Sequence, residues 1–373
     1  MAPTGVGLIG LSTRSSLGPG YWSAVAHLPA IRALQDYEIV AVANSTVESA
    51  QKSIDFHGLS GAKAYGNPAD IARDPRVELV VVSVNVGKHF MLAKPALENK
   101  KSVFVEWPLG ASIAESEELA KLAAANGVET IVGVQARADP LVVKVKELVT
   151  SGKIGRIVST SVMINSSAVP TDTWMQGAEY FMDIKSGGDE FHIIFGHFLD
   201  SFVHVLGGFA DLSALLKSYT TNVPILDSNG QVIQTIHKTS PDHIFVQGTL
   251  VSGAVASIAQ RKSKSPVDNT GYRWIITGTE GELEVTLPET NWQLSAPERA
   301  IRMKLGRGEA QNIDYLPGDD VIEATVPSVG ANVARLYNNF AKGDKENYAT
   351  FESALETHRL LDRILRSAGW DSV

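Results

Sequence analysis

The sequence contains no cysteine, which excludes disulfide bonds, thiolate metal sites and cysteine nucleophiles. It has no apolar run approaching the roughly 20 residues that span a bilayer, so we expect no membrane partner. Positive charge is in deficit, because 33 Lys and Arg face 41 Asp and Glu, and this argues against direct nucleic-acid binding. No basic segment precedes the first apolar strand, so we expect a cytoplasmic or nucleocytoplasmic protein.

What is present describes a globular protein with two domains. The chain has 373 residues, too many for one ordinary core, and 44% of them are hydrophobic. Strands alternate with helices in residues 1–135, whereas residues 136–373 are rich in strands. We therefore predict a first domain with a doubly wound parallel sheet. The second is predicted to be an α+β domain with an open, mainly antiparallel sheet.

The first apolar strand, residues 6–11, breaks at Gly10. A dinucleotide site needs such a turn, because backbone N–H groups must approach the pyrophosphate closely. The usual G-x-G-x-x-G pattern is only partly present. The residues we assign to this contact are Gly7, Gly10, Leu11, Ser12, Thr13 and Arg14. The alternative is a strand that simply ends in a glycine-containing turn.

The second strand, residues 38–43, ends at Asn44 and Ser45. An acid at this place normally binds the ribose hydroxyls of adenosine and repels a 2′-phosphate. Since none is present, NADP(H) is favoured and NAD(H) is the alternative. A strand that merely ends in polar residues would look the same.

Later strands of the first domain end in further candidate residues. Residues 77–83 are followed by Asn85 and His89, and residues 129–134 are followed by Gln135. The central strand, residues 103–105, ends at a turn that contains Glu106, Trp107 and Pro108. The carboxyl ends of parallel strands form the ligand edge of such a sheet. We assign all six residues to cofactor binding.

In the second domain, we predict strands at 157–165, 210–218, 243–250, 255–260, 274–278 and 282–286. Residues 221–240 are polar and predicted to be a loop, and residues 350–368 form a terminal helix that could pack back on the first domain. A sheet with helices on one face leaves the other face free for a partner subunit. We expect a homodimer or tetramer through that face.

Several motifs give the chain a family resemblance. They are GLIG (7–10), HLPAI (27–31), VEWPL (105–109), LVTSGKIGRI (148–157), GHFLD (196–200) and ITGTEGEL (276–283). In this order they resemble the glucose–fructose oxidoreductase / inositol dehydrogenase / MocA (Gfo/Idh/MocA) family of NAD(P)-dependent oxidoreductases, with its Rossmann domain. Trp22 and PDHIFVQGTL (241–250) make the chain most similar to the fungal galactose-repressor-like branch.

The resemblance implies catalytic residues, and the chain departs from them at two places. Active members have lysine where Trp107 stands, and indole cannot act as a base. They commonly have aspartate where Ile193 stands, four residues before the retained His197. On the predicted helix 189–206, His197 shares one face with Ile193, Asp200 and His204.

Three interpretations of His197 remain: a residue of a pocket beside the nicotinamide, a packing histidine, or a metal ligand with Asp200 and His204. No second cluster completes a coordination sphere, so we expect no metal. The predicted substrate pocket consists of Trp22, Trp107, Ile193, His197 and Asp200. His197 is the predicted proton donor, with Tyr180 and Lys185 as lesser candidates.

Three functions follow from these residues. The first is an NAD(P)-dependent oxidoreductase with a non-standard catalytic set. It would reduce a small, fairly apolar carbonyl or imine substrate, because Trp107 makes the pocket apolar. The second is a catalytically silent, NAD(P)-binding transcriptional regulator whose partner is an activation-domain peptide. The third is a scaffold that no longer binds dinucleotide. The oxidoreductase is favoured.

Overall fold

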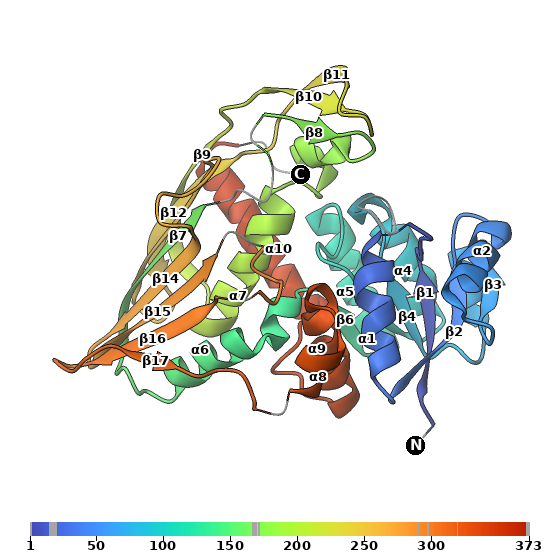
Figure 1. The fold of residues 1–373 in the computed structure, drawn as a ribbon, viewed down its shortest axis with the longest axis horizontal. Helices are drawn as coiled ribbons and strands as arrows, with labels where there is room; N and C mark the ends of the chain where they lie inside the picture. Colours follow the sequence, from blue (N-terminus) through green and yellow to red (C-terminus); the bar gives the residue numbers. More distant parts are fainter. Residues whose placement is uncertain are drawn as a thin grey trace. The chain divides into compact units, whose positions relative to one another are not determined.

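The structure is a computed structural model that describes residues 2–14, 21–165, 170, 172–288, 291–296, 298–318 and 320–370. It divides into two compact units (Figure 1). Unit 1 comprises residues 1–138 and 320–358, and unit 2 comprises residues 139–319 and 359–373. Residues 320–358, which the sequence analysis assigned to the second domain, thus cluster with the first.

Unit 1 contains a six-stranded parallel sheet in the order β3-β2-β1-β4-β5-β6. The strands are β1 (Thr4–Ile9), β2 (Tyr37–Ala43), β3 (Lys63–Tyr65), β4 (Leu79–Val82), β5 (Ser102–Val105) and β6 (Thr130–Val132). The strand order reverses between β1 and β4, the switch point where ligands bind in sheets of this kind. The predicted doubly wound parallel sheet is confirmed.

Five helices of unit 1, α1 to α5, connect these strands, and α8 and α9 come from the returning segment 320–358. They are α1 (Leu28–Ala33), α2 (Val47–His57), α3 (Pro68–Arg73), α4 (His89–Glu98), α5 (Ile113–Asn126), α8 (Val321–Thr325) and α9 (Ser328–Lys342). Side-chain caps set where some begin: Thr46 and Ser112 accept backbone N–H bonds at the N-termini of α2 and α5. A π-helical segment, η1 (Ser23–His27), precedes α1.

The core of unit 1 explains why residues 320–358 return to it. The four residues of β4 are fully buried, as expected for a central parallel strand covered on both faces. One face of α9 contributes Val333, Leu336 and Tyr337 to the same buried cluster as Leu8 of β1. Gly7 of β1 also serves packing, because a Cβ there would lie within 3.1 Å of side chains from α3 and the loop before β4.

Unit 2 contains an eight-stranded sheet in the order β17-β16-β15-β14-β7-β13-β12-β9. The strands are β7 (Ile157–Asn165), β9 (Phe209–Lys217), β12 (His243–Leu250), β13 (Val255–Arg261), β14 (Thr270–Gly278), β15 (Gly281–Pro288), β16 (Ala300–Leu305) and β17 (Gln311–Ile313). Neighbours are antiparallel except β7 and β13, so the predicted mainly antiparallel sheet is confirmed.

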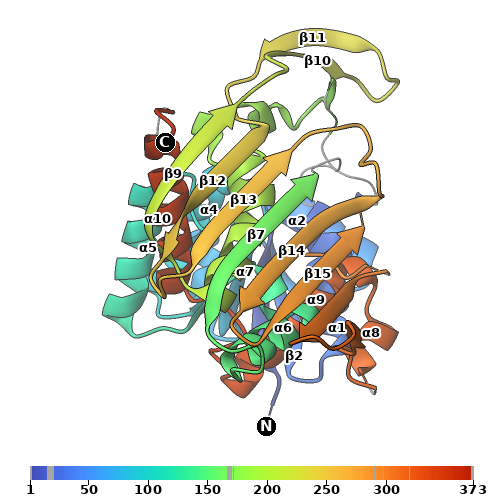
Figure 2. The same ribbon diagram turned by 90° about the vertical axis from the view of Figure 1, so that its left-hand side faces the viewer.

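One face of this sheet is covered by helices and the other is open (Figure 2). The covering helices are α6 (Pro140–Thr150), α7 (Gly196–Leu206) and the second half of α10 (Phe351–Ser367). Phe198 and Phe202 of α7 pack on Trp274 of β14, each with ring centroids 5.7 Å apart. On the open face, Leu215, Phe245 and Met163 are between 42% and 68% exposed.

Two predictions for unit 2 are corrected. Residues 221–240 are not a simple loop, because β10 (Asn222–Leu226) and β11 (Val232–His237) pair there and join β8 (Trp174–Met175) in a small sheet. The predicted helix 189–206 is not uniform either. Its first part is a π-helical segment, η6 (Phe191–Phe195), in which the Phe195 amide bonds to the Glu190 carbonyl.

Candidate functional site

The turn after β1 packs directly against the turn after β4. Gly10 has a φ of 96°, in the region that favours glycine, and its amide donates to the Ala43 carbonyl at 3.0 Å. A Cβ at Gly10 would lie 2.4 Å from Cγ1 of Val84 and 2.5 Å from the Ser83 carbonyl oxygen. Only glycine fits here, so the two turns meet backbone to backbone at the switch point.

The residues after Gly10 form a short loop that is fixed by a hydrogen bond within it and by another from His57 of α2. The Leu11 side chain is buried, so only its backbone could reach a cofactor. The Ser12 hydroxyl accepts the Arg14 amide at 3.0 Å, and Nε2 of His57 donates to the Ser12 carbonyl at 2.7 Å. Thr13 is half-buried and Arg14 exposed. The loop therefore presents a hydroxyl and a cation, and sequence reasoning missed the histidine that anchors it.

Asn44, at the end of β2, is committed to internal bonds through its amide nitrogen. Nδ2 lies 3.0 Å from the Leu11 carbonyl, 3.2 Å from the Ser49 carbonyl and 3.1 Å from the Ser53 hydroxyl. Ser45 beside it is exposed. This edge therefore offers an adenosine ribose the Asn44 amide oxygen and the Ser45 hydroxyl. The two residues that follow β2 supply no carboxylate.

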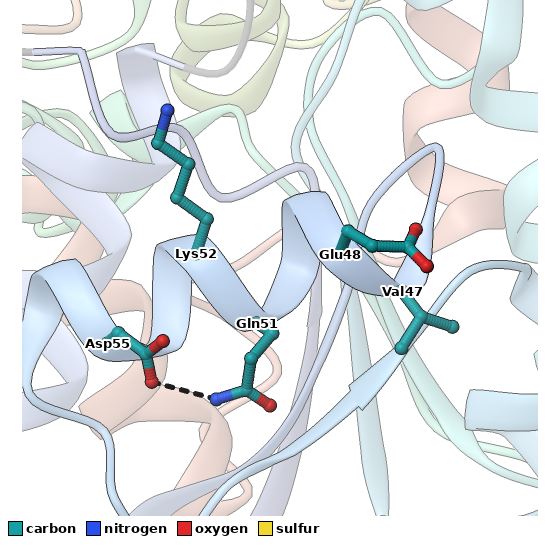
Figure 3. A pocket seen from close by; sticks show the side chains of 5 residues that line it. All are labelled: Val47, Glu48, Gln51, Lys52 and Asp55. Atoms are coloured by element: carbon teal, nitrogen blue, oxygen red, sulfur yellow. Dashed lines mark hydrogen bonds between the residues drawn. The ribbon is translucent and has the colours of Figure 1, made fainter.

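A shallow surface depression follows α2 (Figure 3). It is lined by Val47, Glu48, Gln51, Lys52 and Asp55, and Nε2 of Gln51 donates to Oδ1 of Asp55 at 2.8 Å. All of its lining comes from one helix. Two carboxylates accompany the single lysine, so this face is not suited to hold a phosphate group.

Buried polar atoms near the carboxyl edge of the sheet test whether a dinucleotide fits. Ser83 Oγ, Gln135 Oε1 and Trp22 Nε1 are buried and have no hydrogen-bond partner among the residues that the structure describes. Buried polar atoms normally find a partner, so this edge has unmet bonding capacity. Together with the Gly10 turn, it fits a polar ligand such as a dinucleotide.

Glu106 follows β5 and is held in place by a histidine from η1. Nε2 of His27 lies 2.9 Å from Oε1 of Glu106, and the two side chains are 0% and 12% exposed. A Cβ at Gly133 would lie 2.6 Å from the same oxygen, so the carboxylate fills a gap that only glycine leaves. The sequence motif containing His27 was recognised, but not this contact.

His89 holds Pro108, which lies two residues after Glu106 in the same turn. Its Nδ1 lies 2.8 Å from the Pro108 carbonyl and its Nε2 lies 3.0 Å from the Val84 carbonyl. Burial lowers the pKa of His89, so the neutral ring donates to one of these carbonyls. His89 thus joins the β4 turn to the Glu106 turn. The neighbouring Asn85 is exposed, and its Oδ1 accepts the Gly87 amide at 3.0 Å.

Trp107 packs against the first half of α10, and its peptide bond to Pro108 is cis. Its ring centroid lies 4.6 Å from that of His358, and the Leu109 amide donates to Nε2 of His358 at 3.1 Å. Trp107 is 4% exposed. Trp107, which the resemblance places at the lysine position of active members, is therefore fixed by an aromatic partner from α10 that sequence reasoning missed.

In unit 2, His197 and Asp200 lie at the start of α7 and are 4% and 0% exposed. Burial lowers the pKa of His197 to about 4, although Asp200 acts in the opposite direction. The imidazole is therefore neutral near pH 7. Ile193 lies within the π-helical segment η6 and His197 lies after it, so the regular α-helical spacing used to place both on one face does not apply.

Two buried acid–base pairs involve residues just before and within η6, and sequence reasoning missed both. Nδ1 of His192 lies 2.5 Å from Oδ2 of Asp189, with exposures of 9% and 0%. Nζ of Lys262 lies 2.6 Å from Oε2 of Glu190, with exposures of 4% and 1%. Burial lowers the pKa of Lys262. An acid and a base three residues apart on a helix is a signal that could have identified the first pair.

The remaining candidates of unit 2 lie in different environments. Tyr180 in η4 (Glu179–Met182) and Lys185 in η5 (Ile184–Ser186) are exposed. Ile193 packs against a small hydrophobic cluster that contains Phe181 and Val223. Of the predicted pocket residues in this unit, His197 and Asp200 are thus deeply buried and Ile193 borders a separate apolar cluster.

Within the described residues, no group of three or more His, Asp or Glu side chains is arranged to hold a metal ion. Their helices also include none that is both long and apolar enough to cross a bilayer.

Comparison with known proteins gives two family matches. Residues 17–134 match the Gfo/Idh/MocA model, described as an oxidoreductase family with an NAD-binding Rossmann fold. Residues 140–286 match the model of the Gal80p C-terminal domain.

Similar proteins include both a dehydrogenase and regulators. Dehydrogenase aclE of Aspergillus oryzae is 30% identical over 366 residues, which cover 97% of this chain and 95% of the relative. The galactose/lactose metabolism regulatory protein GAL80 of Saccharomyces cerevisiae is 27% identical over 98% of this chain and 93% of its own. A crystal structure of a Gal80p super-repressor mutant from the same yeast has a TM-score of 0.86 at 25% identity, covering 99% and 96% of the two chains.

Proposed function

The chain belongs to the Gfo/Idh/MocA oxidoreductase family, and on this premise we propose that it is an NAD(P)-dependent oxidoreductase with a non-standard catalytic set. The observation that carries the proposal is the Gly10 turn, whose backbone lies against the β4 turn beside the buried Ser83 hydroxyl, which bonds to none of the residues that the structure describes. A bound nicotinamide supplies the hydride in such enzymes. The protein must bind it, orient the substrate and provide a proton.

The cofactor residues would be the Gly10–Arg14 loop, Asn44 and Ser45, and the residues beyond β4, β5 and β6. The last group comprises Asn85, His89, Glu106, Trp107, Pro108 and Gln135. Backbone N–H groups of the loop would bind the pyrophosphate. NADP(H) is preferred in this proposal, because the side chains at the end of β2 include no carboxylate to repel a 2′-phosphate.

The catalytic set lacks the family's lysine, so the proton chemistry must differ. Trp107 can donate one hydrogen bond but cannot accept a proton, and its indole favours a fairly apolar carbonyl or imine substrate. His197 is neutral near pH 7, so it would polarise the substrate by a hydrogen bond. Tyr180 and Lys185 remain the candidates for the proton itself.

The open face of the eight-stranded sheet supports a proposal about assembly. Leu215, Phe245 and Met163 project from it and are largely exposed. Phe245 lies opposite Leu215 in the register of β12 and β9. An apolar row of this kind is covered most simply by a second copy of the same sheet. We therefore propose a homodimer or tetramer formed through this face.

A second candidate is a catalytically silent regulator that uses the dinucleotide as a signal and binds an activation-domain peptide. The match of residues 140–286 to the Gal80p C-terminal domain favours it. The missing lysine is also what a loss of catalysis would leave.

One experiment separates the two candidates. Purified protein is titrated with NADPH and NADH while nicotinamide fluorescence is followed over hours with a panel of apolar carbonyl and imine compounds. Tight binding with substrate-dependent oxidation supports the oxidoreductase. Tight binding without turnover on the panel supports the regulator, and an absence of binding contradicts both.

A further inference from the structure

Glu106 is the end of a buried chain of hydrogen bonds that begins on α9. The Tyr337 hydroxyl lies 2.8 Å from Nδ1 of His27, and Nε2 of His27 lies 2.9 Å from Oε1 of Glu106. Tyr337 and His27 are both fully buried. The three residues come from α9, η1 and the turn after β5, so this chain of hydrogen bonds links three separate elements of unit 1.

The direction of each bond follows from the groups at its two ends. Oε1 of the Glu106 carboxylate can only accept, so Nε2 of His27 donates to it. Nδ1 of the same tautomer accepts, and the Tyr337 hydroxyl donates to it, since burial raises the pKa of Tyr337 well above its ordinary value. Tyr337 therefore selects the tautomer that can hold the carboxylate.

The remaining neighbours of His27 leave this arrangement undisturbed. The Phe104 ring lies edge-on at 5.0 Å and offers no proton acceptor of comparable strength. The Tyr37 hydroxyl donates to the backbone carbonyl of Tyr337 at 2.8 Å and so lies outside the chain to Glu106. The titratable groups that face His27 are thus Glu106 and Tyr337.

The same short segment also holds the other turn of the site. Ser23, at the start of η1, donates its hydroxyl proton to the Gly10 carbonyl at 2.5 Å. The π-helical segment from Ser23 to His27 therefore joins the Gly10 turn to Glu106. Segments of this kind are rare and are often found at functional sites.

We propose that Tyr337, acting through His27, is a positioning residue that fixes the Glu106 carboxylate beside the dinucleotide. The proposal rests on the proposed dinucleotide binding, and it assigns roles to two residues outside the predicted site. Glu106 follows β5 at the ligand edge of the sheet, where a fixed carboxylate can accept hydrogen bonds from the hydroxyl or amide groups of a cofactor. A carboxylate that is free to turn would lose part of this binding.

The test compares two tyrosine variants from the same core. Tyr337→Phe removes the hydroxyl that bonds to His27, whereas Tyr37→Phe removes a buried hydroxyl that bonds only to a backbone carbonyl. NADH and NADPH affinities are measured by nicotinamide fluorescence from pH 5.5 to 8, together with thermal midpoints. We expect similar midpoints for both variants and a dissociation constant raised about tenfold in Tyr337→Phe alone.

A comparison of affinity with stability distinguishes positioning from a packing effect. Without the Tyr337 hydroxyl, no donor to Nδ1 selects the His27 tautomer that holds Glu106, so Tyr337→Phe should lose affinity for the dinucleotide although its thermal midpoint matches that of Tyr37→Phe. His27→Gln offers a second variant, because its amide can donate to Glu106 without a choice of tautomer. Adding Tyr337→Phe to His27→Gln should then have little further effect on affinity.

The proposal is overturned by equal affinities for wild type and Tyr337→Phe, or by equal losses in the two tyrosine variants. Full additivity of Tyr337→Phe and His27→Gln would also overturn it, because the residues would not act in series. Failure of the proposed function is recognised separately, since wild-type protein would then bind neither NADH nor NADPH.

Discussion

Lowering the pH from 7 to 5 should destabilise unit 2 through His197. Burial lowers the pKa of this imidazole from 6.5 to about 4. The unfolded chain therefore takes up a proton here as the pH falls below 6.5, whereas the folded chain does not until about pH 4. The contribution to stability is complete above pH 6.5 and is lost as the pH falls toward 4. The free energy of unfolding should drop by about 2 kcal/mol between pH 7 and pH 5 from this group.

Urea unfolding at pH 7 and pH 5 measures this loss, with His197→Gln as the decisive variant. Glutamine does not titrate, so the variant should lose about 2 kcal/mol less than the wild type over the same interval. His237→Gln, on the exposed strand β11, is the matched control and should behave as the wild type does. If His197→Gln and the wild type lose equal stability, the buried imidazole is not the group responsible and the reasoning fails.

The other predictions concern the cofactor and the assembly. Gly10→Val should abolish dinucleotide binding, because φ is 96° and the new Cβ would lie 2.5 Å from the Ser83 carbonyl oxygen. A circular dichroism spectrum checks folding, and retained affinity by nicotinamide fluorescence would move the site elsewhere. Asn44→Asp should weaken NADPH binding about tenfold relative to NADH, because a carboxylate repels the 2′-phosphate. An unchanged ratio of the two affinities would remove Asn44 from the ribose site. Phe245→Glu should reduce the oligomer to smaller species in light scattering, because it adds charge to the apolar row of the open sheet face. A mass equal to that of the wild type would argue against this interface.

The parallel sheet could be predicted because the sequence signals for its strands and helices lie within each segment. Short buried strands such as β4 are apolar throughout, and the helices between them have clear caps and periodicity. The hairpin of β10 and β11 was missed because β11 is almost entirely exposed and its sequence lacks the alternation that marks a half-buried strand. The packing of α9 on the core of unit 1 was missed, because α9 is amphipathic on its own and its sequence does not indicate which core it joins.

The contacts that fix the candidate site are long-range, and this is why the sequence revealed the residues but not their partners. His27 was seen in a motif, yet Glu106 lies 79 residues away and Tyr337 lies 310 residues away. The two π-helical segments could not be predicted either. The spacing of apolar residues predicts a helix, but it does not reveal an added residue in one of the helix's turns.

The turn that contains Trp107 is held by contacts with three other elements, so its structure alone does not separate an enzyme from a regulator. Three histidines from different elements hold residues 106–109: His27 bonds to the carboxylate, His89 to the proline carbonyl and His358 to a backbone amide. The Trp107 ring lies within this frame, tilted against the His358 ring with centroids 4.6 Å apart. A turn fixed at three points serves hydride transfer and silent cofactor binding equally well. Unit 1 therefore explains how a dinucleotide could be held, while the choice between enzyme and regulator depends on whether unit 2 can supply a proton. Among the proposed proton donors, Tyr180 and Lys185 are exposed, whereas burial lowers the pKa of His197 to about 4 and leaves its imidazole neutral near pH 7.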